Sequence, residues 1–172
     1  TMKDKDPATL FDVQNTRSPI NWLIEDGLLT NKAPGGNNII SKQKFSDFKV
    51  RVEYKLEPKS NSGIYLRGSS KSQVNMWCRP AGSGEVYGYR TDAQQSPEVR
   101  AGVTPAKVAD KPIGQWNRFV IVMKGDRLTV RLNGELVINN AQLPGVPAKG
   151  PIALQHHGDA IEFSSILIRE LP

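Results

Sequence analysis

The sequence predicts an all-β protein, built as a sandwich or a barrel of many short strands. Runs in which apolar and polar residues alternate recur along the chain, and turn-forming residues separate one run from the next. The 15 glycines and 12 prolines supply the turns that such a fold needs. No segment keeps a helical repeat over about 10 residues. These three observations favour strands over helices throughout the chain.

The clearest alternation begins at Phe48. Every second residue from there to Leu56 is apolar and the residues between are charged, which predicts a strand with one face toward the core. Turn-forming residues at 58–63 interrupt the run, and 64–67 resumes it. We therefore expect a hairpin-like pair whose polar face carries Glu53 and Arg67. A carboxylate and a guanidinium on one face form either a solvated ion pair or the edge of a sugar site.

The other expected strands follow the same signals. The Asp-Gly pair at 26–27 and the Asn-Gly pair at 133–134 lie between apolar residues and predict two tight hairpins. The run at 116–124 is apolar on both faces after its third residue, which indicates a central, buried strand. Further strands are expected at 39–41, 73–77, 128–132, 135–139, 150–157 and 160–171, with turns at 69–72, 125–126 and 158–159. We expect the final strand either as one bent strand or as two short ones.

The stretch from 79 to 111 has no long periodic pattern and holds several glycines and prolines. A loop of this length inside a compact domain is usually functional or disordered. Tyr87, Tyr89, Arg90 and Asp92 are interleaved within it. We therefore expect an ordered loop with a function.

Length and composition indicate one domain. We expect a flexible N-terminal arm at 1–9 and a single β-sandwich domain at 10–172. No apolar stretch reaches the roughly 18 residues of a membrane helix, so no membrane span is expected. The net charge of +6 comes from scattered Lys and Arg residues without a basic run, which argues against nucleic acid as a partner. The single cysteine excludes an internal disulfide, no metal-binding motif is present, and nothing indicates an oligomeric state.

Polar residues alternate away from apolar neighbours on several of the expected strands, and they share one face if those strands share one sheet. They are Glu53, Arg67, Gln73, Asn75, Trp77, Gln155 and His157. Sugar hydroxyls need paired donors and acceptors, and the C–H face of a sugar ring stacks on an aromatic side chain. This composition predicts a carbohydrate site. The alternative is a solvent-exposed sheet face.

The glycine-rich segment at 82–90 is a second candidate site. Its glycines would let the backbone approach a ligand or a neighbouring strand closely. Glu85 would act there as a general acid or base, with Tyr87 and Arg90 beside it. The alternative is a glycine-rich hairpin with an exposed glutamate.

The two neighbouring histidines separate by strand alternation. His156 goes to the core side, and His157 goes to the polar face. His157 is the candidate for proton transfer, because an unperturbed histidine titrates near neutral pH. No cofactor is evident, but a divalent cation held by His157 with Glu53 or Glu85 is a further alternative.

Four segments occur in a characteristic order: NSGIYLRG at 61–68, QWN at 115–117, RLTVRLNG at 127–134 and GPIALQHHG at 150–158. Their order and spacing resemble the 3-keto-disaccharide hydrolase domain family, and the resemblance covers nearly the whole chain from Leu10. It implies a concanavalin-A-like jelly-roll sandwich of two antiparallel sheets. It also implies a sugar site on the concave sheet and cleavage of glycosides already oxidised at C3. The resemblance also implies a protein that is usually exported and often a lipoprotein, so a secreted or periplasmic bacterial protein is expected. The polar start at Thr1 is typical of a trimmed or mature chain, and a lipid-anchored precursor is an alternative.

One position departs from the family pattern. Many members carry Glu-x-Gln on the strand after the Arg-Gly pair, where this chain has Gln73-Val74-Asn75. The resemblance then implies that Glu85 or Glu53 supplies the carboxylate, or that catalysis is altered or lost.

The resulting prediction is an enzyme that cleaves glycosides or disaccharides, 3-keto forms included, by acid–base chemistry. Its candidate catalytic residues are Glu85, His157 and Glu53. Its candidate substrate-binding residues are Arg67, Gln73, Asn75, Trp77, Tyr87, Arg90 and Gln155. A non-catalytic carbohydrate-binding module of the same fold and a structural interaction domain are the alternatives.

Overall fold

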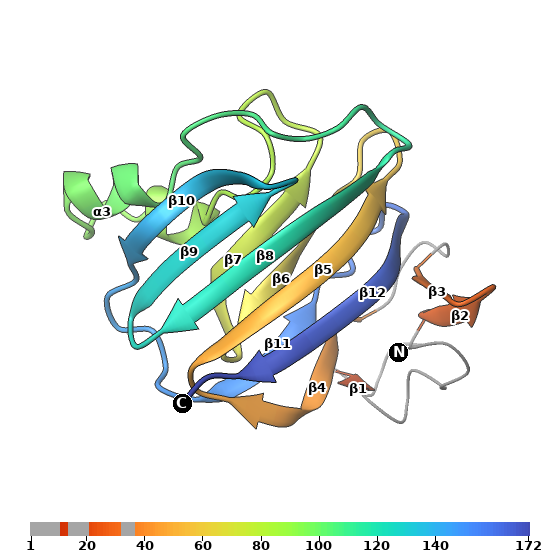
Figure 1. Ribbon diagram of the computed structural model, residues 1–172, viewed down its shortest axis with the longest axis horizontal. Helices are drawn as coiled ribbons and strands as arrows, with labels where there is room; N and C mark the ends of the chain where they lie inside the picture. Colours follow the sequence, from red (N-terminus) through yellow and green to blue (C-terminus); the bar gives the residue numbers. More distant parts are fainter. Residues whose placement is uncertain (1–10, 14–20, 32–36) are drawn as a thin grey trace.

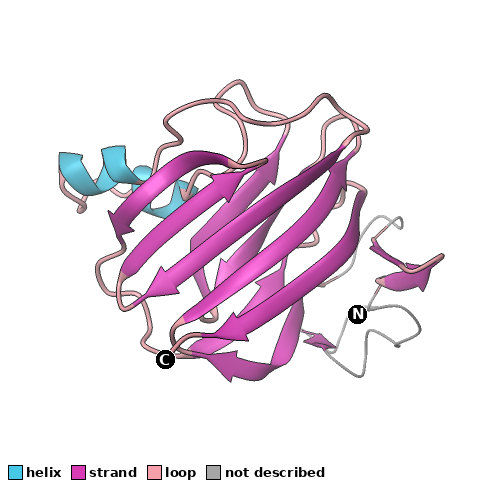
Figure 2. Cartoon of the chain, viewed as in Figure 1, coloured by secondary structure: helices cyan, strands magenta, loops and turns pink. Residues whose placement is uncertain are grey.

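The computed structural model describes residues 11–13, 21–31 and 37–172. Two antiparallel sheets pack face to face, and the apolar core lies between them (Figures 1 and 2). The strands of the five-stranded sheet are, in spatial order, β1 (Phe11–Val13), β4 (Ile39–Phe45), β11 (Gly150–Leu154), β6 (Asn61–Leu66) and β7 (Ser69–Trp77). Those of the seven-stranded sheet are β10 (Glu135–Gln142), β9 (Arg127–Leu132), β8 (Trp116–Lys124), β5 (Phe48–Leu56), β12 (Ile161–Glu170), β3 (Leu28–Thr30) and β2 (Leu23–Glu25). The predicted all-β sandwich of two antiparallel sheets is confirmed.

Strand β5 spans the predicted residues and shows the predicted faces. Its five alternate residues from Phe48 to Leu56 are at most 3% exposed, and they line the core. Burying each of these side chains stabilises the fold by about 1.5–3 kcal/mol. The Asp-Gly and Asn-Gly pairs both have positive φ angles, 51° and 77° at 26–27 and 53° and 86° at 133–134, as the predicted hairpin turns require.

The predicted pairing of β5 with the following strand is wrong. β5 belongs to the seven-stranded sheet and β6 to the five-stranded sheet. The turn around Pro58 and Lys59 carries the chain from one sheet to the other. The Ser60 amide closes this turn by donating to the carbonyl of Glu57, and the Ser60 hydroxyl donates to the carbonyl of Ala160. Glu53 and Arg67 therefore do not share a sheet face.

Two further local predictions are corrected. The turn before β7 is not at 69–72 but at Arg67-Gly68, where φ is 53° and 73°. Leu66 pairs directly with Ser69 across it.

The strand at 116–124 is not buried on both faces. Val120 and the other residues on its side of the strand are half-buried or exposed, and only the opposite face reaches the core. Strand β12 is one strand with a bulge between Phe163 and Ser165, so the bent-strand alternative holds.

The stretch at 79–111 is ordered and carries two short helices, α2 (Tyr87–Arg90) and α3 (Pro97–Gly102). Helix α2 packs closely on β7 at Gly88. A Cβ at this position would lie only 2.6 Å from the carbonyl oxygen of Lys71, so the contact requires glycine. Ser96 caps α3 by accepting a hydrogen bond from the Val99 amide. Figure 1 shows both helices at one side of the sandwich. The expected arm at 1–9 lies outside the described residues, and within the described part no helix is long and apolar enough to cross a membrane.

Candidate functional site

A row of amide side chains lies on the outer face of the five-stranded sheet. Gln73 Nε2 donates to Gln155 Oε1 at 2.6 Å, and Asn75 Nδ2 donates to Gln73 Oε1 at 3.2 Å. β6 lies between the strands that supply these residues. Gly63 of β6 makes the row possible, because a Cβ there would come within 2.7 Å of Gln73 Cδ. Gln73 thus crosses over a glycine to reach Gln155, and this amide row defines the polar face.

Glu85 lies at the end of the amide row. The Asn75 amide donates to the carbonyl of Glu85, and the Gly84 amide donates to the carbonyl of Asn75, each at 2.9 Å. The Glu85 side chain is 4% exposed and forms an ion pair with Nε of Arg90. Arg90 itself is 38% exposed, so the pair borders solvent on its cationic side. A carboxylate and a guanidinium are therefore held beside the amides, as the glycine-rich segment indicates.

The two predicted aromatic residues differ in what they offer a ligand. Trp77 is 4% exposed, and its Nε1 donates to the carbonyl of Gly82 at 2.8 Å. The Arg79 guanidinium lies 4.3 Å from its ring centroid and covers it. Tyr87 meets Trp77 edge-on and is 43% exposed. Tyr87 is therefore the more exposed of the two rings, although the guanidinium groups of Arg90 and Arg79 lie 5.3 and 5.8 Å from its centroid.

The sequence analysis missed Tyr65 as a member of this face. Tyr65 pairs with Gln73 across β6 and β7, and it alternates with the buried Ile64 and Leu66. Burial raises the pKa of the Tyr65 phenol, although a hydrogen bond with Asn38 acts against this rise. The phenol is therefore a hydrogen-bonding group at neutral pH. The same alternation that selected Gln73 could have selected Tyr65.

An ion pair fastens α2 beside the polar face. Lys71 Nζ lies 2.5 Å from Asp92 Oδ2 and 4.7 Å from the ring centroid of Tyr89. The hydrogen bond from Lys71, together with those from Gln94 and Gln95, lowers the pKa of Asp92 to about 2. Asp92 is therefore ionised at any pH near neutrality, and it holds the segment that carries Arg90.

The structure does not bring Arg67 to the polar face. Its turn conformation directs the side chain inward, where it is 2% exposed. Nε donates to the carbonyl of Ser46 at 2.7 Å, and Nη1 donates to the carbonyls of Gly125 and Pro147 at 2.7 and 3.0 Å. Nη2 contacts Asp47 Oδ1 at 3.1 Å. Burial lowers the pKa of Arg67, and the charge of Asp47 offsets part of this effect. The guanidinium joins loops of both sheets.

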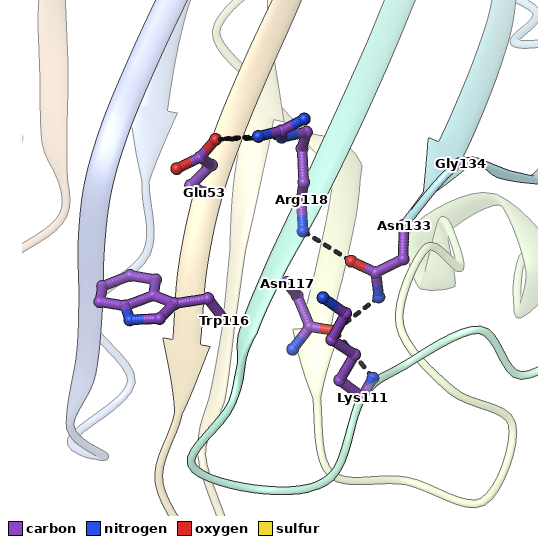
Figure 3. A pocket seen from close by; sticks show the side chains of 7 residues that line it. All are labelled: Glu53, Lys111, Trp116, Asn117, Arg118, Asn133 and Gly134. Atoms are coloured by element: carbon purple, nitrogen blue, oxygen red, sulfur yellow. Dashed lines mark hydrogen bonds and ion pairs between the residues drawn. The ribbon is translucent and has the colours of Figure 1, made fainter.

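Glu53 lies on the outer face of the other sheet (Figure 3). Its Oε1 accepts hydrogen bonds from Nε and Nη2 of Arg118 at 3.0 and 2.8 Å, and Ser164 donates to its Oε2. Partial burial acts to raise the pKa of Glu53, but the hydrogen bonds and the charge of Arg118 outweigh it and lower the pKa. Glu53 thus belongs to a separate pocket, lined by Glu53, Lys111, Trp116, Asn117, Arg118, Asn133 and Gly134.

The strand predicted at 150–157 ends at Leu154, so both histidines lie in the loop that follows it. His156 is nevertheless buried and His157 exposed, as predicted. His156 is 9% exposed and meets the ring of Trp22 edge-on, at 6.0 Å between centroids. His157 follows Gln155 in the loop beyond β11, is 50% exposed, and places Nδ1 3.5 Å from Asp159 Oδ2. No group of three His, Cys, Asp or Glu side chains that could hold a metal ion occurs among the described residues.

The polar face can therefore bind a polyhydroxylated ligand and move a proton. Its amides supply donors and acceptors, Tyr87 supplies a partly exposed ring, and Glu85 supplies a carboxylate beside a guanidinium. Charge-assisted hydrogen bonds, which a carboxylate accepts and a guanidinium donates, are roughly twice as strong as neutral ones. The predicted residues that meet here are Gln73, Asn75, Gln155, Glu85, Arg90, Tyr87 and Trp77, with His157 in the adjoining loop.

Comparisons with known proteins agree with this fold. The family model described as the 3-keto-alpha-glucoside-1,2-lyase-like domain matches residues 7–169. No curated protein matches the chain. A "putative glycosyl hydrolase" from Parabacteroides distasonis ATCC 8503 is 26% identical, with a TM-score of 0.69 over 87% of this chain and 74% of that one. A second structure with the same description, from the same organism, is 17% identical, with a TM-score of 0.68 over 95% and 88%.

A binding protein has the same architecture. The carbohydrate-binding module CBM66 from Bacillus subtilis is 14% identical, with a TM-score of 0.64 over 93% of this chain and 95% of that one. At this identity the likeness shows the fold alone. It confirms the predicted concanavalin-A-like jelly-roll sandwich.

Proposed function

Because the chain belongs to the 3-keto-alpha-glucoside-1,2-lyase-like domain family, we propose that it cleaves glycosides on the polar face of the five-stranded sheet. The family and the structural relatives support a sugar-related role. That this role is catalytic, and that the substrates are glycosides or disaccharides oxidised at C3, is our proposal. We also propose that the protein works outside the cytoplasm. Fractionation of cells that express the full-length protein tests this proposal.

One observation supports the proposal most strongly: the ion pair of Glu85 and Arg90 beside the amide row. The family pattern places a carboxylate on the strand where this chain has Gln73 and Asn75. The Gly84–Glu85 segment hydrogen-bonds to Asn75 and brings a carboxylate back to that edge of the sheet. We propose that Glu85 takes over the role of the carboxylate that is absent from the strand.

The chemistry follows from the ketone at C3 of the sugar. The ketone acidifies the proton on C2, and a carboxylate base within hydrogen-bond reach removes it. We assign this base to Glu85, because it is the carboxyl group that the structure holds beside the amide row, next to the Arg90 guanidinium. The Arg90 guanidinium is the cation that stabilises the negative charge of the resulting enolate.

Loss of the leaving group completes the cleavage. The enolate electrons form a C1–C2 double bond as the C1–O bond breaks, and an acid protonates the departing oxygen. We assign this acid to His157, because its imidazole is 50% exposed in the loop next to Gln155 and histidine is a common general acid. Addition of water to the double bond then gives net hydrolysis. Glu53 and Arg67 lie elsewhere in the structure and take no part in this scheme.

The test compares a 3-keto-glucoside with its unoxidised parent and measures the released aglycone. We expect the Glu85→Gln variant to lower kcat by about 100-fold or more, the usual range for removal of a general base. Gln keeps the shape of the side chain and still accepts a hydrogen bond from Arg90, so we expect the variant to fold. Thermal unfolding verifies that it does. Glu98→Gln on α3 is the matched control, because Glu98 is an exposed glutamate away from the polar face. Full activity in Glu85→Gln would overturn the assignment of the base.

A non-catalytic carbohydrate-binding module is the second candidate. The amides of Gln73 and Asn75, in place of a family carboxylate, support it. In that case the wild type would bind the 3-keto-glucoside without releasing aglycone, and Gln155→Ala would weaken binding. Release of aglycone by the wild type separates the enzyme from the binding module directly.

A further inference from the structure

The outer face of the seven-stranded sheet, which is toward the reader in Figure 1, carries many Lys and Arg side chains. The pairing register sets its side chains in rows across neighbouring strands. One row consists of Arg131, Val120, Arg51 and Leu167, and the next of Thr129, Val122, Lys49 and Arg169. Successive rows lie about 7 Å apart along a strand. Cations alternate with apolar side chains in the first row and lie side by side in the second. We call this surface the basic face.

The charges of the basic face are not balanced within the described residues. Its two carboxylates already have partners, Glu53 with Arg118 and Glu162 with Lys55. The remaining cations form no ion pair with a described carboxylate: Lys49, Arg51, Lys124, Arg131 and Arg169. The charges of Arg51 and Arg131 nevertheless contribute to lowering the pKa of Glu53 and of Glu135. Lys49 and Arg169 lie directly opposite each other, an arrangement that destabilises a sheet. An anionic ligand would relieve this repulsion.

A pocket adjoins the basic face at the end of β8 (Figure 3). Its volume is about 440 Å³, within the range of small-ligand sites, about 300–1,000 Å³. The indole of Trp116, the Glu53–Arg118 pair and Lys111 all border it. A saccharide subsite typically combines an aromatic ring, on which the C–H face of the sugar stacks, with a carboxylate that accepts hydrogen bonds from the sugar hydroxyls. Lys111 forms no ion pair with a described carboxylate, so the pocket adds a further cation.

We propose that the basic face binds an acidic polysaccharide, with one sugar residue in the Trp116 pocket and its carboxylate or sulfate groups along the cation rows. This site lies on the sheet opposite to the polar face and does not rest on the proposed function. It would hold the protein on an anionic polymer while the other sheet remains accessible.

The arrangement fits a polysaccharide better than other polyanions. Binding of a single-stranded nucleic acid needs several aromatic rings for successive bases, and Trp116 is the only aromatic that the register places outward on β9, β8, β5 and β12. Attachment to a lipid surface needs apolar side chains that insert, and the one exposed large apolar residue on these strands is Leu167. A single ring beside rows of cations suits a chain with a charge on each sugar.

The test measures the binding of polygalacturonate by isothermal titration calorimetry at low salt. The matched ligand is the same polymer with its carboxylates methyl-esterified. The charge variant is Lys49→Gln with Arg169→Gln, which removes two exposed cations. The control, Lys42→Gln with Lys44→Gln on β4, removes the same charge from the other sheet. Trp116→Ala probes the pocket, and circular dichroism verifies the fold of each variant.

We expect the charge variant and Trp116→Ala each to bind about tenfold more weakly, and the control to change by less than about twofold. Affinity for polygalacturonate should fall as salt rises, and the esterified polymer should bind much more weakly. The proposal is overturned if polygalacturonate does not bind, or if both polymers bind equally. It is also overturned if DNA or vesicles of anionic phospholipid bind as tightly and Trp116→Ala has no effect.

Discussion

Arg67 offers the sharpest test of how the structure reassigns a residue. The sequence predicted a substrate-binding role, whereas the structure places the side chain between the sheets, with its polar atoms hydrogen-bonded to Ser46, Asp47, Gly125 and Pro147. In the Arg67→Met variant a side chain of similar length fills the space but makes none of these bonds. If Arg67 is structural, stability falls. If it binds substrate, stability is kept and activity is lost.

The expected loss follows from the contacts. Removal of one partner of a buried ion pair costs about 3–5 kcal/mol, because the other groups are left without a partner. Asp47 is 30% exposed and still accepts a hydrogen bond from the Gly125 amide, so water offsets part of that cost. We therefore expect a loss of about 3 kcal/mol in the free energy of unfolding. For a chain of this size, that loss lowers Tm by about 6–12 °C.

The assay is urea unfolding followed by tryptophan fluorescence, with Arg118→Met as the matched control. Arg118 also pairs with a carboxylate, but it is 56% exposed. Loss of an exposed pair costs less than about 1 kcal/mol. Equal unfolding free energies for the two variants would refute the structural assignment of Arg67.

Three other predictions concern the polar face and the packing behind it. Gly63→Ala should displace Gln73 from Gln155 and weaken sugar binding with little change in Tm; unchanged affinity would show that the amide row does not contact the ligand. Gly150→Ala should lower the unfolding free energy by about 3 kcal/mol, since its Cβ would overlap the backbone carbonyl of Arg67. Gly102→Ala in α3 is the control, because a Cβ has room there. The folded-state pKa of Asp92 lies below its unfolded value, so its stabilisation is complete above about pH 4 and is lost as pH falls through about 2. Wild type and Asp92→Asn should therefore differ in Tm above that window and converge below it, and equal Tm values at pH 7 would contradict this.

Strand positions and faces were largely predictable from the sequence, because alternation and turn residues are local signals. The core face of β5 and the outward direction of Gln73 and Asn75 on β7 both follow from period two. The Asn-Gly turn between β9 and β10 needed only two residues to recognise. Each of these features is set by neighbours in the sequence.

The assignment of strands to sheets was not predictable in this way. Alternation gives a strand two faces but does not say which sheet it joins, so Glu53 was grouped with residues of the other sheet. Its partner, Arg118, lies 65 residues along the chain. Arg67 was misplaced because the turn begins two residues earlier than the polar run at 69–72 suggests, and a turn residue follows no alternation. Non-local pairing determined both outcomes.

The most direct test of the central claim is where a sugar binds. We propose to titrate 15N-labelled Glu85→Gln, which does not turn over, with a 3-keto-glucoside and to record amide chemical shifts. Shifts should concentrate at Gly63, Gln73, Asn75 and Gln155 on the polar face. Shifts confined to the Trp116 pocket on the opposite sheet, with none at the amide row, would contradict the account.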